Sequence, residues 1–153
     1  MIFKKKAKAF TLSEVVVTIV ITMIVVGMAF SVLRMVQKEM NSAQKELSEK
    51  TSKERLELAL WIDFNSLPSI SYDKGKEKLT LRNQSDSIIY FFQQEYALRD
   101  NRDTFYLKIA KKHLYRSGDE VIDGKIDAIK LKFEKNLDSM FIYKINTAEF
   151  FMR

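Results

Sequence analysis

An unbroken apolar run near the amino terminus is the strongest pattern in the chain. Residues 15–33 read VVVTIVITMIVVGMAFSVL and contain no charged side chain. A helix of this length covers about 28 Å, close to the ~30 Å thickness of a hydrocarbon layer. β-Branched residues favour strands in water, but in lipid the backbone must satisfy its own hydrogen bonds, which favours a helix. The run therefore predicts a membrane-spanning helix, in which Thr18 and Thr22 bond back to the preceding turn.

Two other interpretations of the run stay open. A buried core helix could have the same composition, although no polar stripe interrupts the run. A secretory signal peptide also pairs a basic start with an apolar stretch, and Gly27-Met28-Ala29 could be its small-residue cleavage site. Against a signal peptide, Glu14 lies at the edge of the run, where a carboxylate is costly and points to a function.

Helical periodicity continues beyond the run, over residues 34–61, without glycine or proline. An apolar stripe over 36–47 gives way to charge pairs spaced i,i+4 over 46–54, which predict a solvated face. Apolar residues return over 56–64, where the helix is expected to dock on a folded head. Pro68 ends the helix, because residues before proline avoid the helical region.

The rest of the chain alternates between apolar and polar residues at period two, which predicts short strands. The clearest run is 126–134, where apolar and charged side chains occupy opposite faces. Turn signals at 73–76 and 117–119 separate neighbouring runs. Strands are expected at 70–72, 78–82, 87–92, 104–110, 113–116, 126–134, 139–145 and 148–152. The pattern predicts an α+β fold in which a long helix packs on an antiparallel meander with one solvated face.

Composition excludes several kinds of chemistry. The 153 residues include no cysteine, one histidine and four glycines. Without cysteine there is no disulfide framework, thiolate zinc site or cysteine nucleophile, and a multi-histidine metal site needs more histidines. Four scattered glycines cannot form a phosphate-binding loop. No catalytic constellation remains, so the chain is expected not to be an enzyme.

The formal net charge of +6 is concentrated at the amino terminus. Lys4, Lys5, Lys6 and Lys8 supply four of the six net charges, which leaves +2 for residues 10–153. Lysines before an apolar segment favour a cytoplasmic amino terminus, with the folded head on the far side of the membrane. A nucleic-acid-binding domain would need a basic face elsewhere in the chain.

The amino-terminal residues resemble those of type IV pilins and type II secretion pseudopilins. The resemblance covers 4–33 and joins a basic leader, the sequence Phe-Thr-Leu-Ser-Glu at 10–14 and the long apolar run. It implies that prepilin peptidase cuts between Ala9 and Phe10 and then methylates the new amine of Phe10. The family usually has glycine before the cut, and alanine, which is also small, is expected to preserve processing.

Glu14 and Phe10 together indicate an assembly contact. After cleavage, the Phe10 amine would carry a positive charge four residues upstream of the Glu14 carboxylate. The two could pair within one helix, whereas in a filament Glu14 could meet the amine of a neighbouring subunit. Because an unpaired carboxylate is costly when desolvated, this pairing would set the axial register. The alternative is an interfacial carboxylate without a partner.

The resemblance further implies a minor pilin or pseudopilin, a structural subunit of a type II secretion pseudopilus or a type IV pilus. It would be stored in the inner membrane with a periplasmic head and would join the filament at or near its tip. Its partners would be other pilins, prepilin peptidase and the inner-membrane assembly platform, with nucleic acid only in a DNA-uptake pilus. The alternative is a membrane-anchored or secreted periplasmic binding domain without a filament role.

The resemblance to pilins also divides the chain into four parts. These are a cleaved leader at 1–9, a transmembrane and assembly helix at 10–33, its soluble continuation at 34–64 and an antiparallel head at 65–153. The order of elements over 55–134 is also similar to that of minor pseudopilins of the J type.

The head offers few residues for metal or acid–base chemistry. His113 has no second histidine or cysteine to join it and is expected to be a surface strand residue. Asp119, Glu120 and Asp123, beside Gly124, could line a calcium loop, as in some pseudopilins. Their spacing differs from that of an EF-hand, and a turn with solvated acids is the alternative. No other cofactor is expected.

Aromatic residues in the head point mainly to core packing. Alternation within strands should bury half of those in 90–106, rather than expose them as a platform for single-stranded DNA. Residues 100–103 are expected to form a hairpin loop. Phe141, Tyr143, Phe150 and Phe151 could form an edge that contacts a partner pilin.

Overall fold

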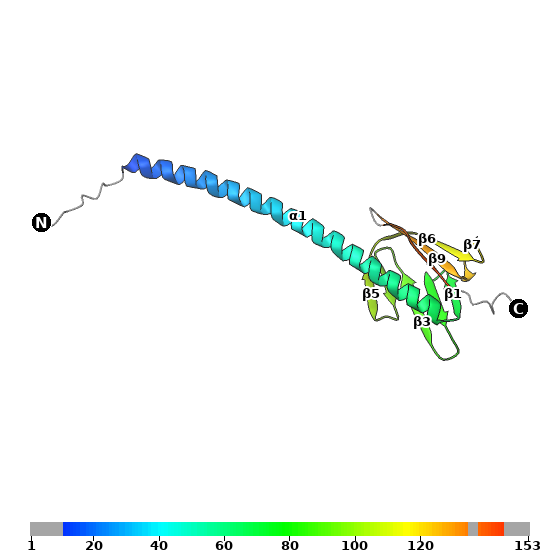
Figure 1. The fold of residues 1–153 in the computed structure, drawn as a ribbon. Coiled ribbons are helices and arrows are strands. Elements are labelled where there is room, and N and C mark those ends of the chain that lie inside the picture. The colour runs from blue at the N-terminus through cyan, green and yellow to red at the C-terminus, as the bar shows by residue number, and fades with distance from the viewer. Residues whose placement is uncertain (1–10, 135–137, 146–153) are drawn as a thin grey trace. The chain divides into compact units, whose positions relative to one another are not determined.

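The computed structural model describes residues 11–134 and 138–145 (Figure 1). Within these residues the chain forms one α-helix, α1 (Leu12–Ser66), followed by ten β-strands. Every strand pairing is antiparallel. The predicted α+β, pilin-like architecture is therefore confirmed. The chain divides into two compact units, Met1–Lys45 and Glu46–Arg153.

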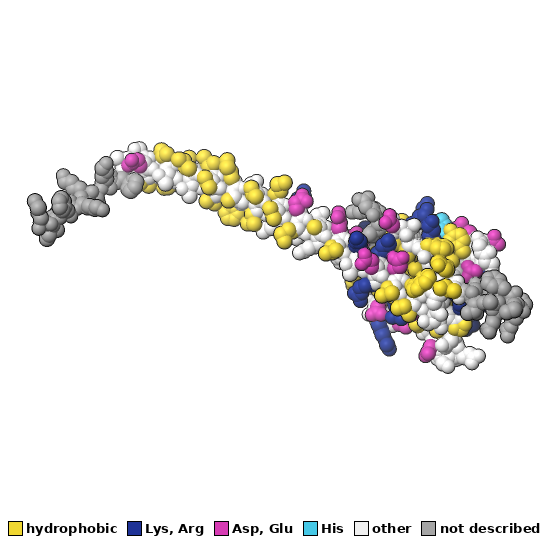
Figure 2. Space-filling view, viewed as in Figure 1, with side chains coloured by type: hydrophobic (Ala, Val, Ile, Leu, Met, Phe, Trp, Pro, Cys, Tyr) yellow, Lys and Arg dark blue, Asp and Glu magenta, His cyan; other side chains and the backbone are white. Residues whose placement is uncertain are grey.

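The described part of the first unit is the amino-terminal portion of α1, in which every side chain is exposed. Large apolar side chains between Val15 and Leu33 are exposed by 45% at Val26 to 68% at Met23 (Figure 2). The helix is long and apolar enough to cross a membrane, and its most apolar window, with a mean hydropathy of 2.7, is unburied. This exposure argues against a buried core helix. A signal sequence near the amino terminus would have the same length and apolar composition, so that interpretation stays open.

Hydroxyl groups inside the apolar run are satisfied by the helix itself. Thr18 Oγ1 donates to the carbonyl of Glu14 at 2.7 Å, and Thr22 Oγ1 donates to the carbonyl of Thr18 at 2.7 Å. These bonds confirm the back-bonding expected for threonines in an apolar helix. The helix also continues through Gly27 without interruption.

The second unit combines the last turns of α1 with two antiparallel sheets. The first sheet has the order β5-β4-β3-β2-β1-β8, and the second has the order β10-β9-β6-β7. The first contains β1 (Ser69–Asp73), β2 (Lys78–Arg82), β3 (Ser87–Phe92), β4 (Tyr96–Arg99), β5 (Asp103–Tyr106) and β8 (Gly124–Lys125). The second contains β6 (Ile109–Arg116), β7 (Asp119–Val121), β9 (Ala128–Phe133) and β10 (Met140–Tyr143).

The two sheets differ from the single meander expected from the sequence. The run 104–110 is divided, because β5 ends at Tyr106 and β6 begins at Ile109 to pair with β9 instead of β5. Leu107 and Ile109 are both buried at this change of sheet, and they keep the spacing of a single strand although Leu107 lies between β5 and β6. The strands β4, β7 and β8 were not expected. The strand expected at 148–152 lies outside the described residues.

The core of this unit is formed by one face of α1 and the inward positions of the strands. Leu56, Leu60 and Phe64 are fully buried at spacings of four residues, whereas Leu58 is 60% exposed. The expected docking over 56–64 is confirmed, with one helical stripe carrying it. Alternation in β9 follows the prediction, since Ile129, Leu131 and Phe133 are buried.

Candidate functional site

Thr11 and Glu14 form a reciprocal cap at the start of α1. The backbone N–H of Thr11 donates to Glu14 Oε2 at 2.9 Å, and Thr11 Oγ1 donates to the same oxygen at 3.0 Å. In return, Glu14 N donates to Thr11 Oγ1 at 3.4 Å. This is a capping box, which satisfies donors that a helix amino terminus leaves without partners. This cap was not predicted, although its Thr-x-x-Glu spacing is visible in the sequence.

The cap changes what is expected of the Glu14 carboxylate. It lies in the first turn, where the helix dipole favours a negative charge, and both donors of Thr11 converge on Oε2. Oε1 accepts no hydrogen bond within the described part of the chain. Among the described residues, the carboxylate is therefore held through Oε2 alone. Its pairing with an amine on a neighbouring subunit stays a prediction.

The other residues of the predicted processing site lie outside the described residues. These are the leader lysines Lys4, Lys5, Lys6 and Lys8 and the two residues at the cut, Ala9 and Phe10. The cut and the methylated amine therefore remain predictions from the sequence. In the sequence, Phe10 immediately precedes the cap residue Thr11.

Residues 4–30 match the family described as the prokaryotic N-terminal methylation motif. The match spans the lysine-rich leader, the Phe-Thr-Leu-Ser-Glu sequence and most of the apolar run, and it is consistent with a type IV pilin or pseudopilin. No curated protein and no solved structure matches the chain. The motif and the exposed apolar helix support a pilin-like prepilin peptidase substrate with a single-pass inner-membrane anchor.

His113 lies on a strand, β6, as expected, and its side chain is half-buried at the surface. Its Nδ1 is 2.6 Å from Glu120 Oε1 on β7, and the side chain of His113 is 28% exposed. Its Nε2 is buried and has no hydrogen-bond partner in the described residues. The contact links neighbouring strands of the second sheet.

The acids proposed for a calcium loop have other partners. Glu120 contacts His113, and Asp123 Oδ1 accepts a hydrogen bond from the backbone N–H of Lys74 at 3.1 Å. Within the described ranges, no three His, Cys, Asp or Glu side chains are grouped so that they could hold a metal ion. The calcium site stays an untested prediction without a visible ligand cluster.

The remaining head residues mostly follow the sequence predictions. Tyr90, Phe92 and Phe105 are buried, whereas Tyr96 and Tyr106 are exposed, so core packing of half the aromatics is confirmed. The hairpin expected at 100–103 is present between β4 and β5, but its loop is 100–102, because Asp103 already pairs with Arg99; Asp100 and Asn101 have positive φ.

The proposed aromatic edge is visible in part. Phe141 and Tyr143 are 49% and 46% exposed on β10, which is the terminal strand of the second sheet among the described strands. Tyr143 packs edge-on against Trp61 of α1, with ring centroids 5.3 Å apart. Phe150 and Phe151 lie outside the described residues.

A buried acid that was not predicted from the sequence joins α1 to the first sheet. Asp63 is 2% exposed and accepts hydrogen bonds from Tyr90 Oη and from Arg99. Burial and the neighbouring Asp63 raise the pKa of the Tyr90 phenol, and the hydrogen bond to Asp63 raises the pKa of Arg99. The available signal was spacing, because Asp63 falls on the helical stripe of Leu60 and Phe64.

Proposed function

We propose that this protein is a minor pilin or pseudopilin, a structural subunit of a type II secretion pseudopilus or a type IV pilus. The observation that supports the proposal most strongly is the methylation motif at 4–30 together with the amino-terminal stretch of α1, where every large apolar side chain from Val15 to Leu33 is exposed. Such a helix needs an apolar environment on every side, which lipid supplies before assembly and neighbouring helices supply in a filament.

In this proposal the chain starts as an inner-membrane precursor with a cytoplasmic leader and a periplasmic head. Prepilin peptidase removes residues 1–9 and methylates Phe10. The mature helix then moves from lipid into the filament, at or near the tip. The methylation motif supports a structural role, in which the chain contributes shape and contacts to the filament.

The capping box supports a specific role for Glu14 in assembly. Thr11 holds one carboxylate oxygen through two hydrogen bonds, which lowers the cost of keeping the charge at the edge of the membrane. The second oxygen can accept a hydrogen bond from the amine of a neighbouring subunit. A contact of this kind sets the axial position of one helix against the next.

The decisive experiment is mass spectrometry of the mature amino terminus. The full chain is expressed in its own host and, as a control, in cells without prepilin peptidase. The expected product begins with N-methylated Phe10 and appears only where the peptidase is present. A start at Phe30 would show ordinary signal-peptidase secretion, and an intact Met1 in the peptidase-containing host would show a plain membrane anchor; either result would contradict the proposal.

The assembly role is tested separately with Glu14→Ala. We expect the variant to enter the membrane normally and to lose crosslinks to other subunits that carry the same motif. Glu39→Ala, which removes an exposed carboxylate further along α1, serves as the matched control. Normal crosslinking by the Glu14 variant would count against the proposed register contact.

A further inference from the structure

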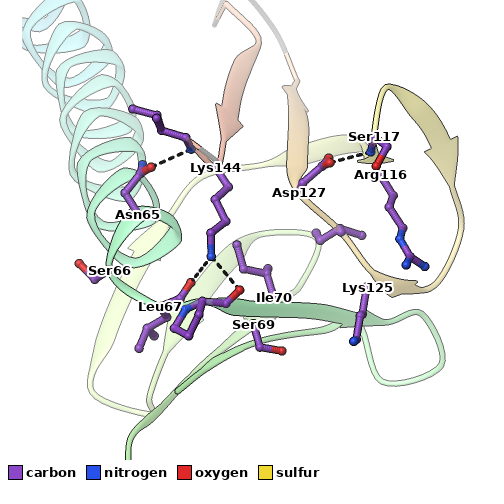
Figure 3. Close-up of a pocket in the computed structure, with 13 residues that line it drawn as sticks. Asn65, Ser66, Leu67, Ser69, Ile70, Arg116, Ser117, Lys125, Asp127 and Lys144 are labelled. Atoms are coloured by element: carbon purple, nitrogen blue, oxygen red, sulfur yellow. Dashed lines mark hydrogen bonds between the residues drawn. The ribbon is translucent and has the colours of Figure 1, made fainter. Parts of the chain in front are cut away.

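The head contains a cavity of about 570 Å³ that is lined by both polar and apolar side chains (Figure 3). Its walls come from four segments that are distant in sequence. These are 65–70 at the end of α1 and the start of β1, 116–117 at the β6–β7 turn, 125–127 after β8, and 144–145 after β10. The cavity therefore opens between the ends of the two sheets and the end of the helix.

Lys144 extends into this cavity from the helix side (Figure 3). Its Nζ donates to the backbone carbonyls of Leu67 at 2.9 Å and Pro68 at 2.7 Å. Burial lowers the pKa of this ammonium group. An ammonium has three N–H donors, so one remains after both carbonyls are satisfied. The two bonds fix the position of the charge and leave one donor for a ligand.

Arg116 and Lys125 lie on the opposite side of the cavity from Lys144 (Figure 3). Both are exposed, and neither forms an ion pair within residues 11–134 and 138–145. The cavity also contains one carboxylate, Asp127, whose Oδ2 accepts a hydrogen bond from Ser117 N at 2.6 Å. Three cations against one acid, which is already hydrogen-bonded, make the cavity positive.

Apolar side chains and hydroxyls complete the lining. Leu67, Ile70 and Ile126 are buried beside the cavity, and Ser66 and Ser69 supply hydroxyl groups. A cavity of this volume is within the range of sites that enclose a sizeable ligand, larger than a lone inorganic anion requires. The walls therefore combine an anion-binding part with an apolar part.

We propose that this cavity binds an acidic peptide segment of a partner protein, with carboxylate side chains facing Arg116 and Lys125 on one side of the cavity and Lys144 on the other. Guanidinium groups bind carboxylates through two parallel hydrogen bonds, and the lysines add charge without a fixed geometry. The apolar wall receives the carbon chain beside the carboxylate. The inference goes beyond the filament role, because it concerns only the head and needs no processed amino terminus.

The binding test uses the full chain in neutral detergent micelles. The probe is a rhodamine-labelled peptide of alternating alanine and glutamate, and binding is followed by fluorescence anisotropy. An otherwise identical peptide of alternating alanine and glutamine controls for contacts that need no charge. We expect saturable binding of the acidic peptide and none of the neutral one. Equal binding of both peptides, or no saturable binding of either, overturns the proposal.

Single variants locate the binding site. Arg116→Gln and Lys125→Gln should each raise the Kd by about tenfold, since each removes a cation from the cavity. Lys76→Gln and Arg102→Gln remove exposed cations that do not line the cavity, and they should change the Kd by less than about twofold. If all four variants weaken binding equally, the peptide is held by general charge and the proposal is wrong.

Two further measurements keep the result interpretable. Fluorescence of Trp61, the single tryptophan, should match the unmodified protein in every variant, which shows that the head is folded. Lys144 is left unchanged, because its two carbonyl contacts give it a structural role. Inorganic phosphate and acetate are then added as competitors. Displacement of the peptide by either anion at micromolar concentration would assign the cavity to small anions and overturn the peptide proposal.

Discussion

Arg99 on β4 binds both carboxylate oxygens of Asp63 near the end of α1. Its Nε lies 2.9 Å from Oδ2 and its Nη2 lies 3.0 Å from Oδ1, while Tyr90 Oη on β3 donates to Oδ2 at 2.5 Å. One buried acid is thus shared by two strands of the first sheet. The contact fixes the rotation of the last helical turns more strictly than apolar packing alone, because a bidentate pair has a defined geometry.

Removing this acid should destabilise the head strongly. Asp63→Ala leaves the Arg99 charge without its main partner and is expected to lower the free energy of unfolding by about 3 kcal/mol. Asp103→Asn is the matched control, because Asp103 contacts Arg99 at 3.3 Å with a half-exposed side chain and should cost under about 1 kcal/mol. Urea unfolding followed by Trp61 fluorescence measures both. Equal losses would contradict the central role of Asp63.

The helical stripe gives a second prediction. Leu60→Ala should cost about 3 kcal/mol, since it opens a cavity at a fully buried position. Leu58→Ala removes the same atoms from a position that is 60% exposed and should cost under about 0.5 kcal/mol. The same urea titration compares them. A similar cost for both leucines would show that α1 does not dock on the head through the face described.

Glu77 predicts how stability depends on pH. It binds Lys112 Nζ of the second sheet at 2.6 Å and Tyr72 Oη of the first at 2.5 Å. Burial alone would raise the pKa of Glu77, but the hydrogen bonds from Lys112 and Tyr72 outweigh it and leave the pKa below its ordinary value of 4.5. The folded state therefore releases the proton more readily than the unfolded state does. The resulting stabilisation is complete above pH 4.5 and is lost as the pH falls through the lower folded value.

The test compares the unmodified chain with Glu77→Gln across this pH range. The stability difference should be under about 1 kcal/mol at neutral pH, because the Glu77 side chain is partly exposed and water screens its charge. It should shrink as the pH falls below 4.5. Glu54→Gln, at an exposed position on α1, should show no such change. A difference independent of pH would mean that Glu77 does not act through its charge.

The capping box gives a prediction for the amino terminus. Thr11→Val keeps the shape of the side chain but removes the hydroxyl that bonds Glu14. The first turn should lose about 1 kcal/mol, so the amide protons of Glu14 and Val15 should exchange about fivefold faster in micelles. Thr11→Ser retains a hydroxyl and should exchange at the original rate. Unchanged exchange in the valine variant would argue against the cap.

Patterns within single elements were predictable from the sequence. The apolar run, the docking of 56–64 and the alternation over 126–134 follow from helical and strand periodicity, which report which side of an element is buried. The pairing of the strands was harder to predict from the sequence. Alternation does not identify a neighbouring strand, so the partnership of β6 with β9 and the division into two sheets could not be predicted.

The burial and contacts of isolated polar residues were also difficult to predict from the sequence. Asp63 was not predicted to be buried, although its spacing from Leu60 and Phe64 places it on the buried face of α1. Tyr96 to Arg99 were not expected to form a strand, because Ala97 is the only fully buried residue of β4 and gives little apolar contrast. Lys144 donates hydrogen bonds to the carbonyls of Leu67 and Pro68, and sequence patterns do not predict which backbone carbonyls lie near a lysine.

The position of Thr11 has a consequence for maturation. Every hydrogen bond of the cap joins atoms at or beyond Thr11, on the carboxyl side of the bond between Ala9 and Phe10. A protease that severs that bond leaves these three hydrogen bonds in place. The cap at the start of α1 is therefore compatible with both the precursor and the shortened chain.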